Sequence, residues 1–229
     1  MIRFKLFILI LISIIFTSCK LDSAKYRDNL TVFNGLWRGV QEINGVKSDI
    51  ELLSYNNKFY GYSVTSNILF MGNGYINKKH FNGSYKVYTI DTFTRFGDGT
   101  FNGYVNSSSR VTGDFKNSLG QEGSFNLKLD KDNFYKSSSI DKIATSYNGS
   151  YYNFTIDKSG IIAGTLGDCN MYGRVVIPDN SINIYQITLR LEDCSYEGYY
   201  NGLGRVVENQ ENNFYMFFGN DKNMGFFKF

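Results

Sequence analysis

Side chains suited to acid–base or metal chemistry are sparse in this chain, which has one histidine and three cysteines among 229 residues. The histidine, His80, ends the basic segment 77–80, where a solvated surface position is its ordinary role. Catalytic schemes that use histidine pair it with a carboxylate or a serine, and zinc sites need several Cys or His residues at fixed spacings. The sequence has neither pattern, so we predict no catalytic constellation, no metal site and no cofactor.

Acidic residues offer two weaker candidates for chemistry. Glu192-Asp193, beside Cys194, comes nearest to the paired carboxylates of a glycoside hydrolase, whose separation only the fold determines. Its ordinary role is an exposed strand end. Four aspartates stand near expected turns, where Asp caps its own backbone and where calcium would need a denser oxygen cluster. These are Asp157, Asp168, Asp179 and Asp193.

The third cysteine, Cys19, follows the most hydrophobic segment of the chain. Arg3 and Lys5 precede an apolar run over residues 6–16, and two small residues separate this run from Cys19. A charged start, a short apolar core and small residues at its end are typical of a secretory signal. As a helix the run would reach roughly 16 Å, about half of a hydrocarbon core of roughly 30 Å. We therefore predict a signal peptide at residues 1–18 rather than a membrane span.

Phe16-Thr17-Ser18-Cys19 resembles the lipobox of bacterial lipoproteins, in which an aliphatic residue and two small residues precede a cysteine. The resemblance implies that the Cys19 thiol receives a diacylglyceryl group, that the signal is cut before Cys19, and that the new amine is acylated, for example with palmitate. Two or more acyl chains anchor a protein stably, whereas one binds a bilayer only marginally. Lys20 stands where the inner-membrane retention signal has Asp, so the resemblance favours the outer membrane. The alternative is an ordinary signal peptide with a cysteine nearby.

The remaining charge pattern excludes one class of partner. Loss of residues 1–18 removes Arg3 and Lys5 and lowers the formal charge from +3 to +1. No cluster of Lys and Arg follows, so the footprint of a nucleic-acid-binding protein is missing from the sequence. Residues 19–32 are polar after Cys19, and we expect a lipidated tether there.

Cys169 and Cys194 form an even pair in a chain predicted to be exported. In an oxidising compartment such a pair indicates a disulfide. The closed loop would hold about 25 residues and contribute about 3.5 kcal/mol in the chain-entropy description. The alternative is two buried free thiols.

Composition and periodicity predict an all-β fold. The chain has 23 glycines, 18 tyrosines and 20 phenylalanines but only one proline, and aromatic strands separated by glycine turns have this composition. Phe125, Leu127 and Leu129 alternate with polar residues, as do the apolar positions of residues 111–115 and 185–191, which indicates strands with one buried face. Turn signals between such runs favour antiparallel hairpins. These signals are Gly97-Asp98-Gly99, Asn106-Ser107-Ser108, and residues 157–160 and 220–223.

Internal similarity predicts two domains. Residues 81–91 and 147–157 are identical at seven of eleven positions, and a second frame aligns residues 30–37 with 144–151. The charged, serine-rich segment at residues 131–146 would be the boundary between the two domains. We expect two small antiparallel β-barrel or sandwich domains, at residues 33–132 and 133–229, because closed or curled sheets protect their edges. Recurrence of a simple aromatic-Asn-Gly strand-and-turn unit explains the similarity equally well.

Two short motifs resemble known β-proteins. Gly35-Leu36-Trp37 resembles the glycine-any-tryptophan signature of lipocalins, which implies a tryptophan at the closed end of an eight-stranded cup for an apolar ligand. The alternative role of Trp37 is an ordinary core anchor. The C-terminal residues 225–229 resemble the terminal aromatic signal of outer-membrane barrels, and a last strand packed into a β-domain explains them equally well. Lipid-facing strands need about ten residues with an unbroken apolar face, which these strands lack.

Together these features predict a lipoprotein anchored in the bacterial cell envelope, at the outer membrane, on its periplasmic or outer side. The second domain, with Cys169 and Cys194 among Gly-rich strands, also resembles small β-rich lipoproteins of Gram-negative envelopes. We expect non-catalytic binding of an envelope protein, a glycan or an inhibitor-type partner. The alternatives are a lipocalin-like carrier of an apolar ligand and a hydrolase acting on envelope polymers. A deep apolar cavity near Trp37 would favour the carrier, facing carboxylates the hydrolase, and a flat aromatic patch the binder.

Overall fold

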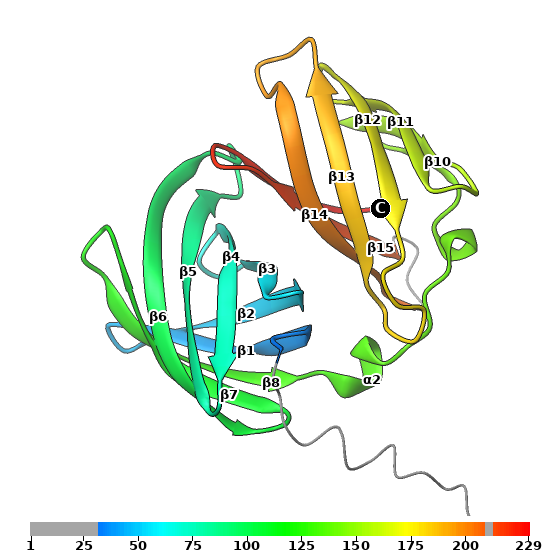
Figure 1. The fold of residues 1–229 in the computed structure, drawn as a ribbon. Helices are drawn as coiled ribbons and strands as arrows, with labels where there is room; N and C mark the ends of the chain where they lie inside the picture. The colour runs from blue at the N-terminus through cyan, green and yellow to red at the C-terminus, as the bar shows by residue number, and fades with distance from the viewer. Residues whose placement is uncertain (1–31, 209–212) are drawn as a thin grey trace, which may run out of the picture. The chain divides into compact units, whose positions relative to one another are not determined.

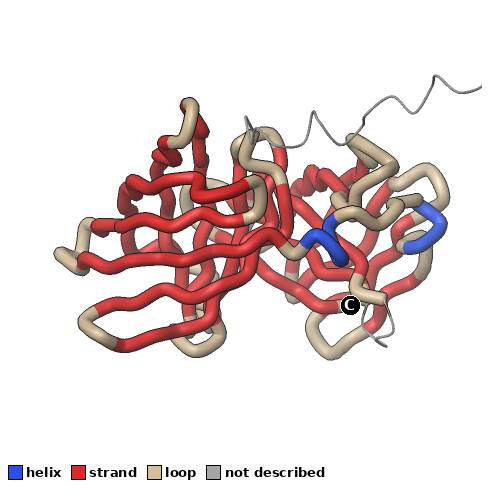
Figure 2. Tube along the Cα trace, turned by 90° about the horizontal axis from the view of Figure 1, so that it is seen from below, coloured by secondary structure: helices blue, strands red, loops and turns tan. Residues whose placement is uncertain are grey.

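The computed structural model describes residues 32–208 and 213–229. The predicted signal peptide, Cys19 and the tether as far as residue 31 lie outside the described residues. The fold is all-β, as predicted, and consists of two eight-stranded antiparallel units (Figure 1). Within the described ranges the helices are α2 (Lys131–Phe134) and the 3₁₀ turn η1 (Ile140–Lys142), both in the segment of chain that follows the last barrel strand and precedes the curled sheet (Figure 2). None of the described helices has the length and apolar character needed to cross a bilayer.

The first unit is a closed barrel. Its strands pair in chain order, and β8 pairs back to β1 with Trp37 opposite Leu129. Each connection is a hairpin, so all turns lie at the two ends of the barrel. The strands are β1 (Gly35–Ile43), β2 (Val46–Tyr55), β3 (Lys58–Ser63), β4 (Ile68–Asn77), β5 (His80–Thr89), β6 (Arg95–Ser107), β7 (Arg110–Asn117) and β8 (Glu122–Leu129).

The second unit is a curled sheet of eight strands, again paired in chain order. Its two outer strands come close without pairing, because the ring of Phe229, directly after β16, lies 5.4 Å from that of Tyr147 in β9. One continuous apolar cluster fills the concave side of the sheet. The strands are β9 (Ser146–Asn148), β10 (Tyr152–Ile156), β11 (Ile161–Leu166), β12 (Cys169–Val176), β13 (Tyr185–Glu192), β14 (Gly198–Val206), β15 (Phe214–Gly219) and β16 (Met224–Lys228).

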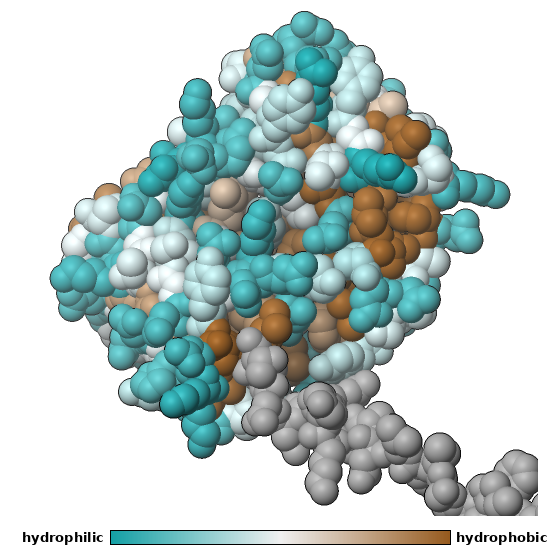
Figure 3. Space-filling view, viewed as in Figure 1, coloured by the Kyte–Doolittle hydropathy of each residue, from teal (hydrophilic) through white to brown (hydrophobic). Residues whose placement is uncertain are grey.

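The predicted period of two is confirmed in both units. Phe125, Leu127 and Leu129 of β8 are buried, and the same holds for the apolar positions of β13. Polar residues between them face outward, so most of the molecular face seen in Figure 3 is hydrophilic, with apolar side chains gathered in a few patches. Ile161 and Val176, at neighbouring ends of β11 and β12, are about half exposed.

The turn predicted at Gly97-Asp98-Gly99 is wrong, because these residues lie inside β6. The chain reverses before Arg95 and again after Ser107 instead. Gly99 stands directly opposite Tyr85 of β5, and the tyrosine ring covers the place where a side chain of residue 99 would be. Glycine is therefore required here for close packing within a strand rather than for a turn.

The sequence echo between residues 81–91 and 147–157 does not extend to the local structure. Residues 81–89 form one continuous strand within β5, whereas residues 147–157 span β9, a turn and β10. The second alignment, of residues 30–37 with 144–151, matches the start of β1 with that of β9. These are the first strands of two meanders that each have eight strands.

Glycines opposite aromatic residues recur around the barrel. At six places an inward-facing aromatic residue pairs across the strands with a glycine, and its ring lies within 3.0 Å of where a Cβ would stand. A side chain at any of these glycines would displace the ring. The pairs are Gly61 with Phe70, Gly72 with Phe59, Gly83 with Phe101, Gly99 with Tyr85, Gly113 with Phe125, and Gly123 with Phe115.

An ion-pair network connects the barrel to the curled sheet within the compact unit Thr31–Phe229. Arg205 of β14 is almost fully buried, and its Nη2 donates to Glu51 Oε1 of β2 at 2.6 Å. The other oxygen of Glu51 accepts from Arg38 Nε at 2.9 Å, and Arg38 Nη1 also pairs with Asp130 at 2.6 Å. The Arg205 guanidinium lies 4.5 Å from the centre of the Tyr215 ring. The two buried charges, those of Arg205 and Glu51, are thus paired, as burial in a protein interior requires.

The β15–β16 turn contacts the barrel through backbone groups. The Tyr88 hydroxyl donates to the Asn220 carbonyl at 2.7 Å, and the Met224 amide donates to the Phe93 carbonyl at 2.9 Å. Lys86 forms an ion pair with Asp221 at the same turn. Because backbone atoms carry most of these bonds, the contact depends more on the position of the turn than on its side chains.

Two glycines of β6 test the packing of rings over glycine. In Gly99→Ala the new Cβ would lie 2.5 Å from the Lys116 carbonyl oxygen and 2.6 Å from the Tyr85 ring. We expect a loss of about 1–3 kcal/mol in the free energy of unfolding, measured by urea denaturation, because overpacking of this kind forces backbone shifts. The matched control is Gly97→Ala, where the nearest atom is 3.5 Å away. This variant should be neutral or slightly stabilising, and equal stabilities of the two variants would contradict the interpretation.

Candidate functional site

The barrel encloses a cavity of about 490 Å³, which we call the cup. Inward-facing side chains of every strand line it, together with Phe33, which precedes β1. Aromatic and aliphatic residues dominate this lining. They are Phe33, Ile43, Val46, Ile50, Leu52, Phe59, Ile68, Phe70, Phe81, Tyr85, Val87, Phe96, Phe101, Phe115, Leu119, Phe125 and Leu127. The polar members are Gln41, Ser48, Ser66, Asn117 and Gln121.

Trp37 closes one end of the cup. Its side chain is fully buried, and its ring stacks on that of Phe33 with centroids 4.9 Å apart. The indole Nε1 donates to Ser54 Oγ at 3.2 Å, and this hydroxyl donates to the Gly35 carbonyl at 3.3 Å. Phe33 in turn contacts Phe81 at 4.4 Å between ring centres. The stacked pair forms the floor of the cup, and the hydrogen bonds fix the orientation of the tryptophan.

The other end of the barrel carries exposed apolar residues around the cup. Val46 is 68% exposed, Leu119 52% and Phe96 42%, and all three line the cavity. They come from the β1–β2 hairpin, the β7–β8 turn and the start of β6, which meet at this end. We call this end the mouth. A ligand would enter here, because these side chains are in contact with both the cavity and the solvent.

Polar groups of the cup gather on one wall near the mouth. Gln41 of β1 and Ser48 of β2 are cross-strand partners, and both are more than nine-tenths buried. Gln41 Nε2 donates to Ser66 Oγ at 3.2 Å, and Ser66 Oγ donates to Ser48 Oγ at 2.9 Å. We call these three residues the polar cluster. At the mouth, Asn117 Nδ2 also donates to Gln121 Oε1 at 2.8 Å. No charged residue occurs among the described residues that line the cup.

Tyr85 carries an unusual hydroxyl on the cup wall. Its oxygen is buried, and no described residue forms a hydrogen bond with it. The ring packs over Gly99 and lies 6.3 Å from the centre of the Phe115 ring. This burial raises the pKa of Tyr85 to about 12, because the phenolate would lose its hydration.

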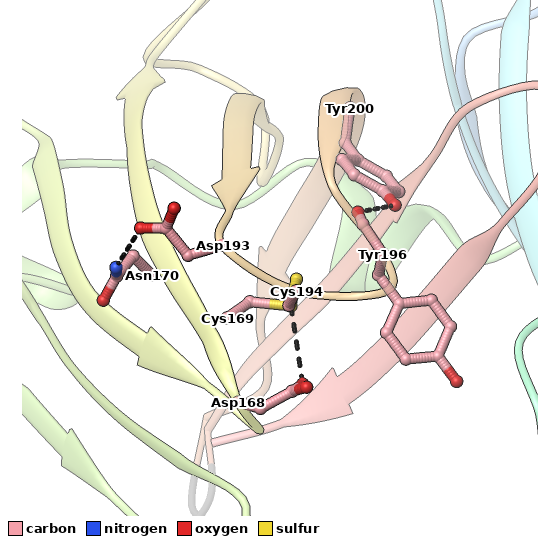
Figure 4. The surroundings of a disulfide bond; sticks show 7 residues. All are labelled: Asp168, Cys169, Asn170, Asp193, Cys194, Tyr196 and Tyr200. Carbon is pink, nitrogen blue, oxygen red and sulfur yellow. Dashed lines mark hydrogen bonds between the residues drawn. A yellow bond between two sulfur atoms is a disulfide. The ribbon is translucent and has the colours of Figure 1, made fainter.

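The two later cysteines form a disulfide, and the alternative of two free thiols is wrong (Figure 4). The bond joins the start of β12 to the turn after β13, with Cα atoms 4.9 Å apart. Beside it, Asn170 Nδ2 donates to Asp193 Oδ2 at 2.7 Å, and Asp168 Oδ1 lies 3.9 Å from Cys169 Sγ. Asp168 and the two sulfurs come close enough together for a metal, but the disulfide leaves no thiolate to act as a ligand.

The predicted acidic candidates have local roles in the structure. Glu192 pairs with Arg190 at the end of β13. Asp157 Oδ1 accepts from the Ser159 amide at 2.8 Å, and Asp179 Oδ1 accepts from the Ser181 amide at 2.8 Å. Hydrogen bonds to these serines, through both hydroxyl and amide, lower the pKa of Asp157 and of Asp179. Both aspartates cap their own turns, the role expected from sequence.

His80 is exposed at the start of β5, and its ring centre lies 4.9 Å from that of Tyr104 on the outside of the barrel. It is not among the residues of the cup. Sequence reasoning missed the polar cluster. One signal for it was present, because Gln41 and Ser48 occupy inward positions of β1 and β2, where alternation calls for apolar residues.

No protein-family description, curated protein or solved structure matches this chain.

Removal of the Tyr85 hydroxyl should not destabilise the protein. We expect Tyr85→Phe to leave the free energy of unfolding unchanged or to raise it by about 1 kcal/mol, since a buried donor without a partner carries a desolvation cost. The control is Tyr147→Phe, which removes a hydroxyl that donates to the Ile143 carbonyl at 2.8 Å and should lose about 1 kcal/mol. Thermal unfolding of both variants checks the difference. A larger loss in Tyr85→Phe than in Tyr147→Phe would mean that the Tyr85 hydroxyl has a partner.

Proposed function

We propose that this protein is a non-catalytic binding protein that takes an apolar or amphiphilic small molecule into the cup. The observation that carries the proposal is the cup itself, with its floor at Trp37 and its open mouth. Its volume falls within the range of about 300–1,000 Å³ of ligand pockets, and its lining is mainly apolar with a few polar groups, as in such pockets. An apolar molecule would gain from leaving water for this surface.

The arrangement of carboxylates favours this function over hydrolysis. Glu51 and Asp130 stand near one another, but both are bonded to the Arg38 guanidinium on the outside of the barrel. A glycosidase needs one carboxyl group as a proton donor and a second facing it across the substrate. Arg38 neutralises both carboxylates and Arg205 also pairs with Glu51, so these charges are instead suited to hold the elements together.

A variant that fills the cup tests the proposal. Ile50 and Val87 both line the cavity and are buried. In the Ile50→Phe/Val87→Phe variant of residues 20–229, we expect one-to-one binding of the neutral dye N-phenylnaphthylamine to weaken about tenfold or more, because the larger rings occupy its space. Dye fluorescence gives the affinity. Trp37 is the only tryptophan of the chain, so energy transfer from it gives a second readout.

The control for this experiment is Val176→Phe, on the exposed side of the curled sheet. It adds an exposed phenylalanine without touching the cup and should bind the dye as the native chain does. Dye binding that survives in the filled variant, or that is never saturable, would refute the cup as the binding site.

We also propose that acyl chains on Cys19 hold the protein at the bacterial envelope. The support is the lipobox-like sequence before Cys19 and the short apolar run preceding it. In a Gram-negative host, mass spectrometry should find that the native protein begins at Cys19 and carries acyl groups. The Cys19→Ala variant should lack them, since its side chain has no thiol to modify. Identical unacylated species from both chains would disprove the anchor.

A second candidate function is binding of an envelope protein or glycan by the outer face of the curled sheet. Tyr172, Arg190 and Tyr199 are neighbours across β12, β13 and β14. Tyr199 is 72% exposed, and the Arg190 guanidinium lies 5.6 Å from the centre of its ring. Exposed tyrosines give a partner large contact area at low entropy cost, which is the specific feature that favours this function.

A further inference from the structure

The cup differs chemically along its axis. Toward the floor its lining is aromatic and aliphatic, with Phe33, Leu52 and Phe81 around the end that Trp37 closes. Toward the mouth the lining includes the polar cluster and the Asn117–Gln121 pair. A molecule with one apolar end and one polar end therefore fits in a single direction, with its tail against the floor.

The polar cluster has hydrogen-bonding capacity that the protein itself leaves unused. Within the cluster Gln41 donates to Ser66 and Ser66 donates to Ser48. Among the described residues, none accepts from the Ser48 hydroxyl and none donates to Gln41 Oε1. The Ser66 amide also donates to Ser63 Oγ at 3.3 Å, which holds the β3–β4 loop in place. The wall of the cup thus offers a donor and an acceptor side by side, which matches a hydroxyl or an ester group.

The absence of charged side chains from the described lining of the cup indicates an uncharged ligand. A carboxylate or ammonium group that enters an apolar cavity loses hydration, and only a counter-charge or several hydrogen bonds offset this cost. No described residue that lines the cup is charged. The cluster supplies neutral hydrogen bonds alone, which suit an uncharged oxygen.

We propose that the ligand of the cup is an uncharged single-chain amphiphile, such as a long-chain alcohol or a monoacylglycerol. Its tail lies against the phenylalanines of the floor, and its oxygen bonds with the Ser48 hydroxyl and the Gln41 carbonyl. This inference rests on the proposed function and adds the chemical class and the orientation of the ligand.

Four probes with the same tail test this inference: octane, octanol, octanoate and octyltrimethylammonium. Each is titrated into residues 20–229, which contain the whole compact unit Thr31–Phe229, and affinity is measured by displacement of N-phenylnaphthylamine. We expect octanol to bind most tightly, about tenfold better than octane, because it adds hydrogen bonds to an equal tail. Octanoate and octyltrimethylammonium should bind at least about tenfold more weakly than octanol, because each would bring an unpaired charge.

Variants of the polar cluster separate the contribution of the ligand's oxygen to the affinity from that of its tail. Gln41→Leu and Ser48→Ala should each lower octanol affinity toward that of octane and leave octane affinity unchanged, since each removes one of the two hydrogen bonds to the ligand oxygen. Two variants are used so that a folding defect in one still leaves the other as a test, and circular dichroism checks the fold of each. The matched control is Gln186→Leu in β13 of the curled sheet, which should bind octanol as the native chain does.

The outcomes distinguish this inference from the proposed function. If none of the four probes displaces the dye, the cup is not a ligand site and the proposed function fails with it. If octane binds and octanol binds no better, or if a charged probe binds most tightly, the neutral-amphiphile assignment is overturned while the cup remains a binding site. Tighter octanol binding that both cluster variants retain overturns the assignment of Gln41 and Ser48.

Discussion

The packing of an aromatic ring over a glycine of the neighbouring strand is the constraint on which the barrel depends. Interiors of eight-stranded barrels are usually just wide enough for side chains to fill. Here six inward positions opposite rings have only a hydrogen atom, so each ring covers the strand beside it. Two consequences follow. Glycines permit the strong curvature that barrel closure needs, and rings placed against the wall leave the centre open as the cup.

The second unit supports the barrel from outside. Arg205 of the curled sheet forms an ion pair with Glu51 of the barrel. Arg38 pairs with Glu51 as well and with Asp130, which directly follows β8. Loss of one partner from such a buried pair is costly, because a charge is left without compensation. The disulfide between Cys169 and Cys194 restrains the curled sheet in turn, and its loop corresponds to about 3.5 kcal/mol in the chain-entropy description. The cup-lining residues all belong to the barrel part of the chain, so the curled sheet acts on ligand binding through its contacts with the barrel, which include this ion-pair network and the β15–β16 turn.

Local patterns in the sequence were enough to predict strands and their buried faces. Alternation at Phe125, Leu127 and Leu129 and the scarcity of helix-forming composition predicted the all-β fold correctly, and the cysteine count predicted the disulfide. Gly97-Asp98-Gly99 misled the prediction, because a glycine covered by a ring on the next strand has the same local sequence as a turn. The resemblance of Gly35-Leu36-Trp37 to the lipocalin signature offered a cup closed by Trp37 as an alternative, but the lining and the volume of the cup could not be predicted. Its volume depends on the register that places Tyr85 opposite Gly99, and this pairing is a property of the closed barrel.

The energetics of the cup separate affinity from selectivity. Each methylene that leaves water contributes about 0.8 kcal/mol, so the tail of a ligand would supply most of the binding free energy. One neutral hydrogen bond to the polar cluster adds only about 1 kcal/mol. A charged head group, by contrast, would lose several kcal/mol of hydration in a cavity with no counter-charge. Gln41, Ser48 and Ser66 would therefore orient a bound molecule, while the lack of charge around them selects against ionised competitors. In such a site the cost imposed on the wrong ligand, rather than attraction for the right one, determines specificity.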